Sequence, residues 1–108
     1  MAGSVTDPLE RFRLDYAPLL LRHLSRRDES GLQAAYQLGR RAMQEQVGLL
    51  DVVRVHHELF LDVLTTVHDP DEVIALTAAA SAILIDLIAS YEVAQLGFMD
   101  GRHGPSPQ

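Results

Sequence analysis

Three consecutive polar side chains, His56, His57 and Glu58, are the residues of this sequence whose types best suit metal binding or proton transfer. A zinc protease needs His-Glu-x-x-His, in which two imidazoles one helical turn apart meet a single metal ion. Here Leu61 stands four residues after His57, and adjacent histidines on a helix point about 100° apart. The Glu-x-x-His pairs of di-iron bundles are also missing. We therefore expect no metal site, with His56 in the core and His57 on its flank.

The same cluster has a second interpretation. His57-Glu58-Leu59 resembles the His-Glu-Leu core of histidine kinase phosphoacceptor boxes, which lie on helices of dimeric bundles. Such a box normally continues with a basic residue, a threonine and a proline, whereas Phe60-Leu61-Asp62-Val63 follows here. A phosphotransfer domain with His57 as the phosphoacceptor is therefore the alternative function.

Asp86 is a lone carboxylate in an apolar stretch, where an unpaired charge would be costly. We expect it to pair with His56, Arg40 or Arg41 from a neighbouring helix. No second carboxylate, serine nucleophile or phosphate-binding loop accompanies it. The sequence therefore predicts no catalytic residues, no enzyme and no cofactor.

Length and composition indicate one small domain and limit the classes of partner that it is expected to bind. The chain has 108 residues, 47% of them hydrophobic, a net charge of −6 and no cysteine. The negative charge disfavours nucleic acid and anionic membranes as partners. Absence of cysteine, together with a short uncharged stretch before the first helix, fits a cytoplasmic protein. No small-molecule ligand is evident from the residues.

The apolar stretch from Val73 to Met99 predicts the longest helix, started by the capping sequence Asp69-Pro70-Asp71-Glu72. It is about long enough to cross a bilayer. Its acidic residues, its alanine content and the lack of a basic cluster at either end favour a buried helix instead, with no membrane. A stripe of mostly small side chains is expected to lie in the core beside a larger apolar stripe. The small stripe comprises Ala75, Ala79, Ala82, Asp86, Ala89 and Val93.

Apolar residues recur at three- and four-residue steps in three earlier segments, which predicts three more helices. Gly39 lies on the inner stripe of the second, where close contact with a neighbouring helix would compensate for its low helix propensity. The predicted helices run from the Asp7-Pro8 cap to about Arg26, from the Asp28 cap to about Gln46, and from Gly48 to about Val67. In the first, Pro18 is expected to bend the helix near Leu14 to Ala17.

The predicted fold is an all-α, four-helix bundle-like domain spanning residues 7–100, after a disordered lead of residues 1–6 and before a linker of residues 101–108. The tight connection at His68-Asp69 makes the third and fourth helices antiparallel. A small core and wide apolar sectors on these two helices favour a homodimer.

Three stretches together resemble the RsbU N-terminal domain family: Tyr36-Gln-Leu-Gly-Arg-Arg-Ala42, Gly48-Leu-Leu-Asp-Val-Val-Arg-Val-His-His57, and the apolar helix from Asp86 to Tyr91. The resemblance covers roughly Leu9 to Met99. It implies a dimeric, four-helix, non-catalytic module that binds a switch protein kinase of a partner-switching stress response. Through that binding it would regulate an attached serine phosphatase or another signalling output.

A partner-binding surface is expected where the second and fourth helices meet, if they are neighbours. An apolar strip edged by polar side chains is the composition of a transient docking site. The two isoleucines of this strip could instead form the dimer interface. The candidate residues are Glu29, Gln33, Gln37, Ser81, Ile85, Ile88, Ala89 and Glu92.

Overall fold

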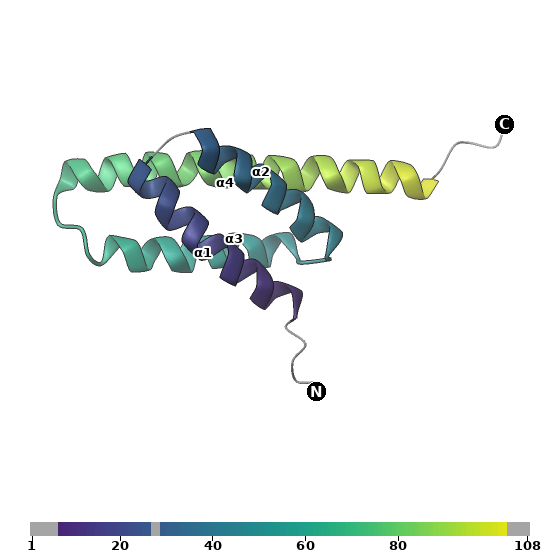
Figure 1. Ribbon diagram of the computed structural model, residues 1–108, viewed down its shortest axis with the longest axis horizontal. Coiled ribbons are helices and arrows are strands. Elements are labelled where there is room, and N and C mark those ends of the chain that lie inside the picture. The colour runs from purple at the N-terminus through teal and green to yellow at the C-terminus, as the bar shows by residue number, and fades with distance from the viewer. Residues whose placement is uncertain (1–6, 27–28, 104–108) are drawn as a thin grey trace.

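The computed structural model describes residues 7–26 and 29–103, with side chains as far as Gly97. Four helices make up this part of the chain, and it contains no strand, which confirms the all-α four-helix prediction. They are α1 (Pro8–Arg26), α2 (Glu29–Gln44), α3 (Leu49–Leu64) and α4 (Pro70–His103). As predicted, α4 is the longest and runs antiparallel to α3 (Figure 1). Helix α2 lies along α4 in the same direction, and α1 crosses the molecule and contacts all three other helices.

The predicted caps begin α1 and α4. The Asp7 carboxylate accepts a hydrogen bond of 2.8 Å from the Glu10 backbone N–H, and the Asp69 carboxylate accepts one of 3.2 Å from the Asp71 N–H. Each bond satisfies a backbone donor that has no partner within the helix. The Asp28 cap expected for α2 lies outside the described residues. Helix α1 is not split by Pro18, which lies on its exposed side.

Helix α2 ends two residues before the predicted Gln46, in a Schellman motif. The Val47 N–H donates to the Ala42 carbonyl at 2.9 Å, and the Gln46 N–H donates to the Met43 carbonyl at 3.0 Å. Gln46 has a φ of 65°, a position where glycine is usual because it has no Cβ. The Tyr91 hydroxyl donates to the Val47 carbonyl at 2.6 Å, which ties α4 to this turn.

Two predicted helix ends are wrong. Helix α3 stops at Leu64 rather than Val67, because the hydroxyls of Thr65 and Thr66 bond to backbone carbonyls in its last turn. Helix α4 continues to His103, three residues into the segment predicted as linker. A single glycine such as Gly101 lowers helix propensity without ending a helix.

The core confirms the larger apolar stripe of α4 and corrects the smaller one. Ala82, Ala89 and Val93 are exposed, although we expected all three to be buried. They are exposed because the close contact between α2 and α4 is made by a small residue of α2, Gly39, and not by the small residues of α4. A Cβ on Gly39 would collide with the Ser90 hydroxyl and the Leu87 carbonyl, as predicted for a tight helix contact. The buried α4 residues of the core are Leu76, Ala80, Ile83, Leu87 and Tyr91.

Much of α4 lies uncovered by the other described helices. The segment Pro70–Gly97 is long and apolar enough to cross a membrane, judged by length and composition, and 28% of its most apolar 18-residue window is buried. Its outward side carries four large exposed apolar side chains: Ile74, Ile85, Val93 and Leu96. This face therefore has no apolar partner among the described residues.

Candidate partner-binding surface

His56 is a core residue, as the sequence predicts. Its Nδ1 lies 2.6 Å from the Tyr16 hydroxyl in a buried hydrogen bond between α1 and α3. Burial, with a smaller contribution from the neighbouring His57, lowers the pKa of His56 to about 4. Burial also raises the pKa of Tyr16. Both side chains are therefore neutral near pH 7, and the pair holds two helices together.

His57 is exposed on α3, so its imidazole is accessible to a phosphoryl donor. The adjacent Glu58 carboxylate is engaged elsewhere, because it accepts a hydrogen bond of 2.6 Å from the Arg13 guanidinium of α1. Glu58 is thus already paired and is less available to act on the His57 imidazole.

The expected ion pairs of Asp86 do not form. His56 bonds to Tyr16, and the Arg41 guanidinium instead binds the Asp15 carboxylate at 2.7 Å. Arg40 has no acidic partner among the described side chains. His56 and Arg41 bond to residues of α1, and Arg40 lines a different hollow one turn beyond Tyr36, which the spacing within each helix could not reveal. Asp86 is half-buried at a hollow between α2 and α4.

This hollow, of about 600 Å³, gathers the candidate residues of α2 around Asp86. It confirms that α2 and α4 are neighbours, which was the condition for a shared surface. Since successive turns of α2 lie beside α4, polar side chains spaced at four residues line the same hollow. Its lining residues on α2 include Glu29, Ser30, Leu32, Gln33, Tyr36 and Gln37.

The candidates on α4 divide into two groups. Ser81, Ile85, Ala89 and Glu92 are exposed, and Ile85 has 65% of its surface accessible. Ile88 is half-buried, because it lies about 60° around the helix from Ile85. None of these five α4 candidates lines the hollow around Asp86. Ile85 precedes Asp86 but lies about 100° around the helix from it, on the outward face of α4.

The polar groups of the hollow around Asp86 come mainly from α2. Its lining is mostly polar, with Leu32 and Tyr36 as the larger apolar contributors, and Glu29 and Asp86 add negative charge. Within residues 7–26 and 29–97 no group of three or more histidine, aspartate or glutamate side chains could hold a metal ion. Sequence reasoning missed Leu32, Tyr36 and Asp86 as members of the surface. Leu32 and Tyr36 each lie three residues after an α2 candidate, Glu29 and Gln33, and this helical spacing was the available signal.

Comparison with known proteins identifies the family of this chain. Residues 14–94 match the family model described as the phosphoserine phosphatase RsbU, N-terminal domain. No curated protein and no solved structure matches the chain. The family match spans all four helices and most of the chain. This protein therefore belongs to the family of N-terminal domains of the phosphoserine phosphatase RsbU, a regulatory domain of a signalling phosphatase.

Proposed function

We propose that this domain binds a switch protein kinase of a partner-switching stress response through the α2–α4 surface. By binding the kinase it regulates an attached serine phosphatase or another signalling output. The observations that carry the proposal are the hollow around Asp86, which polar side chains of α2 line, and the exposed Ile85 on the adjoining outward face of α4. One exposed apolar anchor within a polar rim is the composition of a transient interface.

The same proposal includes a homodimer in the cytoplasm, with its interface on the opposite pair of helices. A hollow of about 390 Å³ lies between α1 and α3 and is lined mainly by Ala17, Leu21, Leu59 and Val63. Leu14 lies two turns before Leu21 on α1 and is also exposed. The hollow between α1 and α3 is lined mainly by apolar residues, whereas the hollow around Asp86 is lined mainly by polar ones. Because lasting dimer interfaces are more apolar than transient ones, we assign the dimer to α1 and α3 and the kinase to α2 and α4.

Two matched substitutions on α4 test kinase binding. Ile85→Asp places a charge at the expected anchor, and Ile74→Asp places the same charge at an equally exposed position nearer the start of α4. By isothermal titration calorimetry with the cognate kinase, we expect Ile85→Asp to weaken binding at least tenfold, which is about 1.4 kcal/mol. Ile74→Asp should bind like the wild type.

Sedimentation of both variants completes the test, because each should remain a folded dimer. Loss of the dimer in Ile85→Asp would place the dimer interface on α4 and contradict our assignment. Equal kinase binding by both variants would remove Ile85 from the docking surface.

Phosphotransfer remains the second candidate because His57 is exposed. Incubation with the kinase and labelled ATP should leave no acid-labile label on the domain if it only binds. Label that disappears in His57→Ala would establish the phosphoacceptor instead. His57→Ala should otherwise cost little stability, since an exposed side chain with few contacts is replaced.

A further inference from the structure

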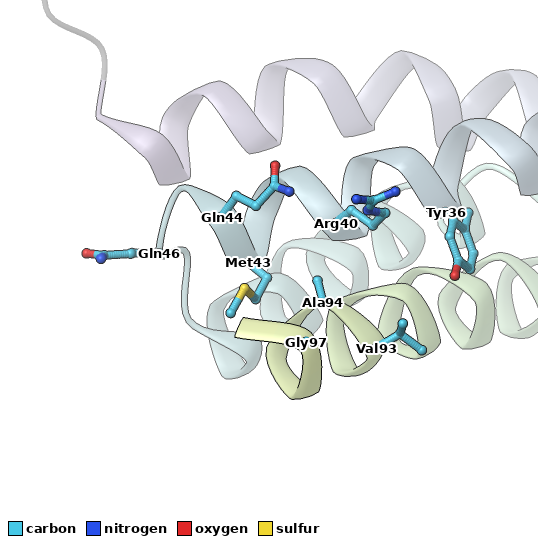
Figure 2. Close-up of a pocket in the computed structure, with 8 residues that line it drawn as sticks. All are labelled: Tyr36, Arg40, Met43, Gln44, Gln46, Val93, Ala94 and Gly97. Carbon is cyan, nitrogen blue, oxygen red and sulfur yellow. The ribbon is translucent and has the colours of Figure 1, made fainter. Parts of the chain in front are cut away.

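A second and larger hollow lies where α4 continues past the end of α2. Its volume is about 650 Å³, and both helices contribute to it (Figure 2). Met43 reaches from α2 toward Ala94 and Gly97, while Tyr36 and Val93 lie at the other end of the hollow. This volume falls in the range of ligand pockets, which is about 300 to 1,000 Å³.

The lining combines an apolar floor with one positive charge. Met43, Val93 and Ala94 supply the apolar surface, and Arg40 supplies the charge. The Arg40 guanidinium has no acidic partner within the described residues, although the chain as a whole carries a net charge of −6. A guanidinium with unused donors at the edge of an apolar hollow is suited to a carboxylate attached to an apolar group.

Two residues at this hollow, Gly97 and Gln46, have a low intrinsic preference for the backbone conformation that they adopt. Gly97 lies within α4, where alanine is the better helix former, yet a Cβ there would meet no atom within 4 Å. Gln46 adopts a left-handed conformation that favours glycine. Helix packing therefore does not require Gly97, and the turn does not favour Gln46. Departures from local preference that bring no packing gain are typical of functional sites.

We propose that this hollow is a binding site for a small amphipathic anion, a carboxylate with an apolar tail. The carboxylate pairs with Arg40, and the tail lies on Met43, Val93 and Ala94, with Gly97 leaving room at the edge. Such a ligand contacts both α2 and the part of α4 beyond Tyr91. Binding therefore fastens these two segments to each other, at a hollow that shares Tyr36 with the kinase surface.

Decanoate is a suitable probe, and isothermal titration calorimetry measures its binding to the full chain. We expect one site per chain, at least tenfold weaker binding in Arg40→Gln, and weaker binding of decan-1-ol, which has the same tail without the charge. Arg22→Gln is the matched control, because Arg22 is an exposed arginine on α1, which contributes no residue to the hollow. Its affinity for decanoate should equal that of the wild type. In Gly97→Leu the added side chain should fill the edge and lower the affinity.

Hydrogen exchange of the unmodified protein gives a readout that does not depend on any variant. Decanoate should slow amide exchange in residues 92–97 and leave α1 unchanged. The proposal is overturned if decanoate does not saturate a single site, if Arg40→Gln binds like Arg22→Gln, or if the protected amides lie elsewhere. If decan-1-ol bound as tightly as decanoate, the carboxylate would not contribute to binding, and the proposed class of ligand, an amphipathic anion, would be wrong.

Discussion

At the scale of single residues, the buried Tyr16 and His56 pair makes stability depend on pH. The pKa of His56 is about 4 in the folded protein, against about 6.5 when unfolded. Between these values the unfolded chain binds a proton that the folded chain does not, so stability falls as pH is lowered. We expect the free energy of unfolding to drop by up to about 3 kcal/mol between pH 7 and pH 4 through this residue.

Urea denaturation of His56→Gln at several pH values checks this expectation. Glutamine does not titrate, so the variant should be less stable at pH 7 and should lose less stability on acidification than the wild type. His57→Gln is the control, because His57 is exposed and its replacement should leave most of the pH dependence in place. If His56→Gln lost as much stability on acidification as the wild type does, a group other than His56 would be responsible for the pH dependence.

At the scale of helices, two glycines predict opposite results for the same substitution. Gly39→Ala forces a methyl group against Leu87 and Ser90 of α4, and such overpacking costs about 1 to 3 kcal/mol. Gly97→Ala adds a methyl group in open space and should stabilise α4 by up to about 1 kcal/mol. Thermal unfolding followed by circular dichroism measures both changes. Destabilisation by Gly97→Ala would mean that the end of α4 is not helical in solution.

At the scale of the whole molecule, the apolar surface of α1 and α3 predicts which substitution should disrupt the proposed dimer. Leu21→Asp puts a charge into the hollow between these helices and should give a monomer in sedimentation velocity at micromolar protein. Leu50→Asp is the control, because Leu50 is equally exposed but lies at the other end of α3. A Leu21→Asp dimer would disprove the assignment, and a wild-type monomer would disprove the dimer itself.

The sequence predicted the features that depend on residue spacing within one helix. It did not predict the features that depend on how helices distant in the sequence pack together. The four helices, both aspartate caps, the core position of His56 and the tight contact at Gly39 follow from local spacing. The exposed small residues of α4 and the missing partner of Asp86 depend on where α2 crosses α4, which no helical pattern specifies. The hollow beside Arg40 was not evident for the same reason, since its residues come from segments far apart in the chain.

The way α2 packs on α4 also sets the order in which this chain can fold during synthesis. Helix α3 separates the two in sequence, so α2 leaves the ribosome before the helix that covers most of its buried side. Contacts between distant segments form late, because a loop must first be closed. Until α4 has been translated, the side of α2 around Gly39, which packs against Leu87 and Ser90 of α4, remains exposed to solvent. A ribosome stalled before Pro70 should therefore carry a protease-sensitive chain, and one stalled well beyond His103 a resistant domain.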